Sequence, residues 1–169
     1  MWGYLFVMKY IITESQHRRL FEEEQKVLHF PSLEYFNGDW NILQKYMERK
    51  VNSLYSLGGD LNLLGSELKS LGNLTSVGGD LLLNDTPIES LGNLTFVGGN
   101  LFLEHTPIES LGNLTSVGGF LYLNDTPIES LGNLTFVGGS LFLKDTPISK
   151  NYSKEEIRQM VNVVGGIFL

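Results

Sequence analysis

Apolar residues recur along most of this chain at a fixed spacing, with a period of about 20 residues. Four copies of one pattern begin at Ser70, Ser90, Ser110 and Ser130 and share the text S-L-G-N-L-T-(S/F)-V-G-G-x-L-x-L-x-x-T-P-I. A weaker copy covers residues 57–63, and residues 167–169 match residues 141–143 at a spacing of 26. A fixed period of this length predicts a solenoid, in which each repeat forms one coil.

Each copy contains a predicted strand with one buried face. Leu81 and Leu83 alternate with more variable residues, which is the period of a pleated strand. The preceding pair Gly78-Gly79 predicts a sharp turn, and Pro87 ends the strand because proline donates no ladder hydrogen bond. Six apolar positions per copy are expected to point inward and stack on their counterparts. Their burial, at ~0.8 kcal/mol per CH₂ group, should dominate the stability.

The segment from Gly78 to Ile88, G-x-x-L-x-L-x-x-T-x-I, resembles the leucine-rich-repeat motif L-x-x-L-x-L-x-x-N-x-L. Gly78 stands in place of the first Leu of the motif, and Thr86 in place of its Asn. The resemblance covers roughly residues 50–149. It implies a right-handed coil with a parallel β-sheet on one face and extended or 3₁₀ backbone on the other. The chain also resembles small uncharacterised repeat proteins of bacteriophages and environmental viruses, which implies a source and no activity.

One threonine per repeat occupies the place of the Asn ladder of the leucine-rich-repeat family. We expect these hydroxyls to be buried and bonded to the backbone of their own or adjacent coils. This structural ladder consists of Thr86, Thr106, Thr126 and Thr146.

Residues 1–50 predict a helical N-terminal cap on the solenoid. Thr13-x-x-Gln16 fits a capping box that opens a helix over residues 14–29. A second helix is predicted to begin near Asp39 as its N-cap. The apolar face of this second helix consists of Trp40, Leu43, Tyr46 and Met47.

Residues 51–149 hold five repeats, the first of them degenerate, and residues 150–169 predict a C-terminal capping helix and strand. Ser153-x-x-Glu156 is a capping box that opens a helix over residues 154–162. This helix absorbs the extra length of the last spacing, and a strand follows over residues 164–169. The predicted buried face of the helix consists of Ile157, Met160 and Val161.

The charge of the chain narrows the classes of partner. The net charge is −7, and residues 1–50 are balanced, so residues 51–169 carry the whole acidic excess. A negative field disfavours nucleic acid as a partner. The apolar start of the chain has no positive segment before it, which argues against a signal peptide, and no apolar run is long enough for a membrane span. These features predict a cytoplasmic protein, and the phage resemblance implies an infected host cell.

Residues suited to catalysis are few and badly spaced. The three histidines, His17, His29 and His105, lack metal-binding spacing, and the chain has no cysteine. Glu89 and Glu109 belong to a row of carboxylates one coil apart, which is typical of a solvated face. We therefore predict no enzymatic activity, no cofactor and no metal.

Variation between the repeats indicates a candidate binding face. The copies that begin at Ser70 and Ser110 differ only at positions 80/120 and 82/122, which suggests duplication of a pair of repeats. The variable positions alternate with buried leucines, so they are predicted to point outward. The candidate face consists of Asp80, Leu82, Asn100, Phe102, Phe120, Tyr122, Phe142 and Phe168. Its aromatic column predicts an exposed apolar stripe, whose truncation should change stability little.

These observations favour a protein-binding or scaffolding module that is a monomer or weak homo-oligomer, with an unidentified protein as partner and no membrane contact. An alternative is a structural or assembly component, for example of a virion. Another is binding of ice or a regular surface through rows of threonine. The aromatic column also has a purely structural interpretation, since aromatic residues suit cross-strand packing.

Overall fold

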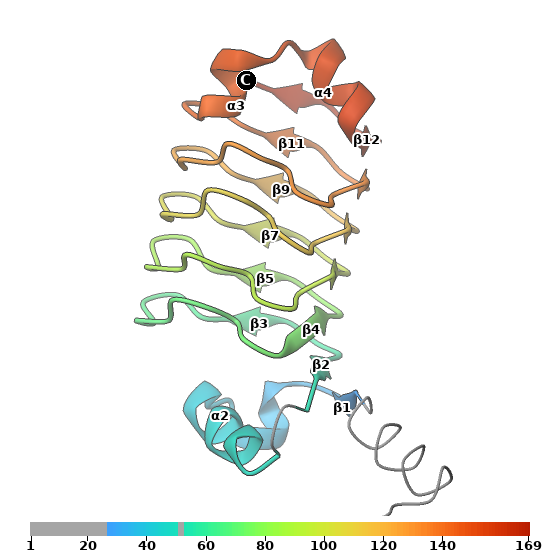
Figure 1. Ribbon diagram of the computed structural model, residues 1–169. Coiled ribbons are helices and arrows are strands. Elements are labelled where there is room, and N and C mark those ends of the chain that lie inside the picture. Colours follow the sequence, from blue (N-terminus) through green and yellow to red (C-terminus); the bar gives the residue numbers. More distant parts are fainter. Residues whose placement is uncertain (1–26, 51–52) are drawn as a thin grey trace, which may run out of the picture.

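The computed structural model describes residues 27–50 and 53–169, which form a β-solenoid whose coils stack one above the next (Figure 1). Each full coil contributes one short strand to each of two parallel sheets, and a third side without named strands connects them. The solenoid of parallel strands predicted from the repeat period is confirmed. The second sheet was not expected from the sequence.

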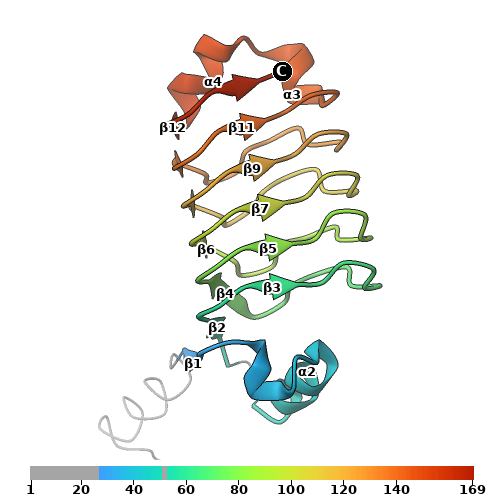
Figure 2. The ribbon, with the colours of Figure 1, turned by 180° about the vertical axis from the view of Figure 1, so that it is seen from behind.

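Both sheets run along the whole stack, and Figure 2 shows sheet B from its outer side. In the described part of the chain, sheet A has seven strands: β1 (Leu28–Phe30), β2 (Tyr55–Leu57), β4 (Leu74–Val77), β6 (Phe96–Val97), β8 (Ser116–Val117), β10 (Phe136–Val137) and β12 (Asn162–Val163). Sheet B has six: β3 (Leu61–Asn62), β5 (Leu81–Leu82), β7 (Leu101–Phe102), β9 (Leu121–Tyr122), β11 (Leu141–Phe142) and β13 (Ile167–Phe168).

The register follows the sequence period. Leu101 pairs with Leu121, its counterpart one repeat further along, and the same offset holds for the neighbouring strands of sheet B. In the last coil the offset is longer, as Leu141 pairs with Ile167. The pairing predicted for the partial copy at the C-terminal end is therefore confirmed.

Sheet A comes from a segment whose sequence pattern hides its strands. In β4 the apolar ends Leu74 and Val77 are buried, and Thr75 and Ser76 between them are both partly exposed. Apolar residues three positions apart do not show the period of two that identifies a strand. The backbones pair between coils nevertheless, with Ser76 opposite Phe96.

The Gly-Gly pair forms the corner between the two sheets, where consecutive coils approach most closely. A Cβ atom on Gly98 would lie under 3.0 Å from the carbonyl group of Gly78 in the coil below, and the same holds for Gly118 against Gly98. Only glycine permits this spacing, which explains why the pair recurs in every coil.

The core consists of columns of apolar side chains, one column for each inward position of the repeat. In one coil the six inward residues are completely buried: Leu111, Leu114, Val117, Leu121, Leu123 and Ile128. Truncation of such a leucine to alanine costs about 2–5 kcal/mol. The columns therefore account for most of the stability of the stack, as the pattern of the sequence predicted.

Two helices continue this core at the N-terminal end: η1 (Leu33–Phe36) and α2 (Trp40–Glu48) (Figure 1). The predicted N-cap of α2 is confirmed, because the Asp39 carboxylate accepts hydrogen bonds from the backbone N–H groups of Asn41 and Ile42 at 2.8 and 3.4 Å. The side chains that α2 buries in the same cluster as the coils are Trp40, Leu43 and Met47.

Two expectations for this segment are wrong. The helix predicted over residues 14–29 does not extend to its end, because Leu28–Phe30 forms β1 and satisfies the edge of β2 by parallel pairing. Its residues 14–26, with His17, lie outside the described part of the chain. Tyr46 does not join the buried face of α2; its ring contacts Phe30 and Phe36 at the rim and is exposed.

Tyr55 anchors the contact between α2 and the first coil. Its side chain is buried beside Trp40, with the two ring centres 6.5 Å apart, and its hydroxyl accepts a hydrogen bond from Gln44 Nε2 at 2.8 Å. Burial disfavours the charged phenolate and raises the pKa of Tyr55 to about 12, against a smaller lowering by the Gln44 bond.

At the other end, α3 (Pro147–Asn151) and α4 (Lys154–Met160) precede the strands of the last coil. The predicted capping box is present: Ser153 Oγ accepts from the Glu156 N–H, and the Glu156 carboxylate accepts from the Ser153 N–H. The Ser153 N–H and, secondly, the Ser153 hydroxyl both donate to the Glu156 carboxylate, and these two bonds lower the pKa of Glu156. Ile157 is buried as predicted, but Met160 is 48% exposed, because α4 ends there and points it away from the core.

Candidate binding face

A stack of aromatic rings runs along the outer face of sheet B. We call the column Leu82, Phe102, Tyr122, Phe142 and Phe168 the aromatic stripe. Three successive pairs of its rings are nearly parallel: Phe102–Tyr122, Tyr122–Phe142 and Phe142–Phe168 have centroid distances of 4.8, 4.7 and 4.8 Å and interplanar angles of 6, 6 and 9°. These separations match the spacing of strands in a sheet, so the solenoid itself dictates the stacking.

The stripe is less exposed than the sequence predicted. Phe102, Tyr122 and Phe142 are half-buried, because each ring covers the face of the next, and Phe168 alone among the aromatic members is exposed. Only the ring edges are free along most of the stripe. The premise that these rings are free until a partner binds is therefore wrong: truncation of Tyr122 would remove two stacking contacts, so we now expect it to lower the stability.

The column beside the stripe is a hydrogen-bonded ladder between coils. Asp80 Oδ1 accepts from the Asn100 N–H at 2.7 Å, and Asn100 Oδ1 accepts from the Phe120 N–H at 2.8 Å. Asp60 begins the ladder by accepting from the Asp80 N–H. The sequence predicted Asp80 and Asn100 as binding residues and missed this structural role. The sequence feature that could have indicated this role is the recurrence of short acceptor side chains at the period of the repeat.

Phe120 interrupts this ladder. Its side chain has no acceptor atom, so the Ser140 N–H in the next coil lacks the side-chain acceptor that Asp80 and Asn100 provide in their coils. The ladder resumes at Ser140, whose hydroxyl accepts a hydrogen bond from the Gly166 N–H at 3.0 Å. The Phe120 ring is 42% exposed and lies tilted against Tyr122 and Phe142, with centroid distances of 6.2 and 6.4 Å. This coil exchanges a backbone partner for an exposed aromatic ring.

A row of polar residues borders the other side of the stripe. This row consists of Asp85, His105, Asp125 and Asp145. Each of these residues follows a strand of sheet B and has a positive φ angle of 56–58°, which Asp, Asn and His adopt more readily than most residues. His105 lies between two carboxylates, 3.4 Å from Asp85 and 3.5 Å from Asp125. Its ring is exposed, so these three side chains form a row of polar contacts at the surface.

The hydroxyls of both threonine rows are committed within the protein. Thr106 is buried and donates to the Leu103 carbonyl at 2.7 Å, and the same bond recurs in every member of the Thr86 row. On sheet A, Thr115 donates to the Thr95 carbonyl of the preceding coil at 2.8 Å, and this bond also recurs along its row. The Thr86 row is buried and cannot meet an outside surface, whereas the exposed hydroxyls of Thr95, Thr115 and Thr135 donate inward and keep their acceptor lone pairs for solvent.

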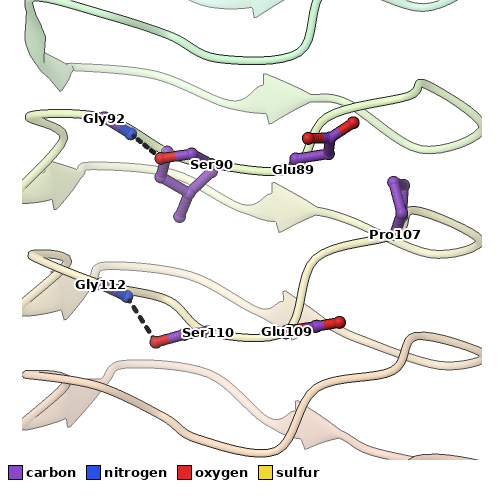
Figure 3. A pocket seen from close by; sticks show the side chains of 8 residues that line it. Glu89, Ser90, Gly92, Pro107, Glu109, Ser110 and Gly112 are labelled. Atoms are coloured by element: carbon purple, nitrogen blue, oxygen red, sulfur yellow. Dashed lines mark hydrogen bonds between the residues drawn. The ribbon is translucent and has the colours of Figure 1, made fainter.

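A cavity of about 580 Å³ opens on the third side of the solenoid, between the segments around Ser90 and Ser110 (Figure 3). Glu89 and Glu109 lie at its mouth. Each serine hydroxyl accepts a hydrogen bond from the glycine two residues later, as Figure 3 shows. Glu89 and Glu109 both line the cavity, and its other lining residues include no histidine or other titratable side chain.

The described residues contain no cluster of three or more His, Cys, Asp or Glu side chains that could hold a metal ion. None of the helices in that part of the chain is both long and apolar enough to cross a membrane. The polar groups of the candidate face instead bond to one another and to backbone, so its free chemistry is apolar contact and negative charge.

The fold and this face define a parallel β-solenoid of short, regular coils with an aromatic column on one sheet. Comparisons with models of protein families, with curated proteins and with solved structures each found no match.

Proposed function

We propose that this protein is a non-enzymatic module that binds another protein through the outer face of sheet B. The observation that supports this proposal is Phe120, which stands where the three preceding coils have a ladder acceptor and leaves its ring 42% exposed. An exposed aromatic residue that replaces a structural bond is better explained by a partner than by the fold. Contiguous exposed apolar surface commonly marks interaction sites.

The centre of the proposed site is the cluster of Phe120, Tyr122 and Phe142. Aromatic side chains near the centre of an interface often contribute most of its affinity, typically ~2 kcal/mol or more when truncated. Phe120 is the most informative position, because its ring is not part of the stack and its loss leaves the stripe intact.

The test is capture of a partner from the native host by the full chain, followed by measurement of its affinity for purified variants. Phe120→Asn should weaken binding at least about 30-fold, the equivalent of ~2 kcal/mol. The matched control is Phe96→Ser on sheet A, because Phe96 is also 42% exposed and serine occupies the same position in β4 and β8. Equal loss of affinity in both variants would refute the placement of the site.

We also propose three finer features that belong to the same interpretation. The coil is of the right-handed leucine-rich-repeat type, and the segments at η1–α2 and α3–α4 act as caps that shield the apolar ends of the stack. Burial of Leu33, Trp40 and Ile157 in the continuous core supports the capping role. The protein acts in the cytoplasm, and the phage resemblance suggests an infected host cell as its setting.

A further inference from the structure

The aromatic stripe lies between two groups of carboxylates. Asp60 and Asp80 border it on the Gly-Gly side, and each uses one oxygen in the ladder. On the turn side the acidic side chains are Asp85, Glu104, Asp125 and Asp145. The basic side chains on this border are Lys144, whose ammonium lies 3.6 Å from Asp145, and His105, which lies between Asp85 and Asp125. The face is therefore strongly negative around an apolar centre.

The outer face of sheet A differs, although it belongs to the same coils. Its outward positions carry no charge: Thr75, Ser76, Thr95, Phe96, Thr115, Ser116, Thr135 and Phe136. The two sheets therefore differ: the negative border belongs to sheet B and not to sheet A.

We propose that the partner of sheet B is a basic protein segment that places an apolar side chain against Phe120 and surrounds it with lysine or arginine. This inference rests on the proposed function. Opposite charge steers association and selects against wrong partners, while the apolar contact supplies the affinity. Asp80 lies two coils below Phe120, roughly 10 Å at the spacing of strands, which is within reach of a lysine or arginine beside the apolar contact.

The test uses random dodecapeptides displayed on phage and selected on the full chain at low salt. The enriched peptides should combine Lys or Arg with an aromatic or large aliphatic residue. The double variant Asp80→Asn with Asp125→Asn should weaken the binding of these peptides about tenfold, because it removes two negative charges from the border of the stripe. Asparagine should preserve the fold at both positions, since it keeps the ladder acceptor, as Asn100 shows, and tolerates positive φ. Binding should also weaken as NaCl rises.

The control variant carries Glu109→Gln with Glu129→Gln on the third side, which changes the net charge equally and should alter affinity less than about twofold. Peptides that depend on Phe120 but are acidic or neutral would overturn the basic partner and leave the proposed function standing. Peptides insensitive to Phe120→Asn would overturn the proposed site itself. If the selection enriches no peptide, the proposal of a basic partner segment is refuted, and the proposed function is then tested only by capture of a partner from the host.

A second inference comes from the third side of the solenoid, where the coils associate in pairs. Ser70 bridges Ser90 and Ser110 bridges Ser130, but Ser90 and Ser110 form no bridge. The Glu129 N–H donates to the Glu109 carbonyl at 2.9 Å; the Glu109 N–H has no corresponding backbone bond to Glu89. The cavity of Figure 3 occupies this position.

The glycines of this side report the same pairing. A Cβ atom on Gly92 would lie under 3.0 Å from Gly72, and one on Gly132 would lie as close to Gly112. A Cβ atom on Gly112 would meet nothing within 4 Å. All of these glycines have φ between 56 and 59°, so their backbone strain on substitution is the same.

We infer that the solenoid consists of two-coil units and that the opening between Ser90 and Ser110 is a joint where the third side can open and close. The sequence S-L-G-N-L-T is identical on the two sides of the joint and within each pair. The same text thus occurs in an open and a closed arrangement within one molecule, so the local sequence is compatible with both.

Hydrogen exchange of the full chain tests this inference. The Ser110 amide should exchange at least about tenfold faster than the Ser130 amide, which donates to the Glu109 carbonyl. In a second measurement, Gly112→Ala should lower the melting temperature less than Gly92→Ala or Gly132→Ala, although all three suffer the same φ strain. Equal protection of Ser110 and Ser130 would overturn the joint, as would a Gly112→Ala loss equal to the other two.

Discussion

Replacement of Phe120 by asparagine separates the stability of the fold from its proposed function. Asn100 occupies the equivalent place one coil earlier and accepts a hydrogen bond from the next coil at 2.8 Å. Asparagine at position 120 should accept in the same way from the Ser140 N–H, a gain of about 0.5–1.5 kcal/mol.

The loss on the other side is of similar size. Complete burial of a phenylalanine side chain contributes roughly 1.5–3 kcal/mol, and Phe120 is 42% exposed, so its share is about 0.9–1.7 kcal/mol. Its tilted contacts with Tyr122 and Phe142 add a smaller amount. The free energy of unfolding of Phe120→Asn should therefore stay within ~1 kcal/mol of the wild type.

Urea unfolding of three proteins measures this balance. Phe120→Ala loses the ring and restores no bond, so it should be less stable than Phe120→Asn by about 0.5–1.5 kcal/mol. Equal stability of the two variants would show that the ladder bond does not form at this position. A loss above ~2 kcal/mol in Phe120→Asn, the cost typical of a core side chain, would show that the ring is a packing residue. That outcome would remove the main support for the proposed site.

The remaining predictions concern the threonine ladder, Tyr55 and the N-terminal segment. Thr106→Val should lower the free energy of unfolding in urea by about 1–3 kcal/mol, because it leaves the buried Leu103 carbonyl without that donor. Thr115→Val on the exposed row should cost under ~0.5 kcal/mol, and equal costs for the two variants would contradict the role of burial. Tyr55 has a folded-state pKa of about 12 against 10.0 for the unconstrained group, so the unfolded state loses this proton first as the pH rises. The free energy of unfolding should therefore fall by roughly 2–3 kcal/mol between pH 10 and 12. Tyr55→Phe should lack this part of the decline in parallel alkaline melts. Deletion of residues 1–50 should cause aggregation by light scattering, since it uncovers apolar core and the edge of β2, and a soluble, cooperatively folded product would show that α2 is not a cap.

Much of the fold could be predicted from the sequence because its determinants lie within one coil. The alternation at Leu81 and Leu83 indicated the strands of sheet B, and the repeat period indicated their register. Asp39 and Ser153 start their helices as predicted, because an N-cap bonds to backbone only two or three residues away. Such local interactions depend on adjacent residues, which the sequence displays directly.

The candidate face was only partly predictable, because its interactions join residues that lie one whole repeat apart. The outward direction of Phe102 and Tyr122 followed from the pleat, but their mutual burial depends on ring stacking between coils. The acceptor role of Asp80 likewise needs the N–H of Asn100 placed beside it by the stack. An aspartate on a predicted strand surface shows no sign of such a bond within its own repeat.

The sequence by itself determined the solenoid, its period, its inward columns and the glycine corners, since each of these follows from a repeated local pattern. Only the tertiary structure decided how the third side of the coils associates. The text around Ser70, Ser90, Ser110 and Ser130 is the same, yet the first two and the last two are bridged while Ser90 and Ser110 are apart. Identical neighbours cannot encode that difference. It depends on the distance between whole coils, which is set jointly by the sheets and the ends of the stack.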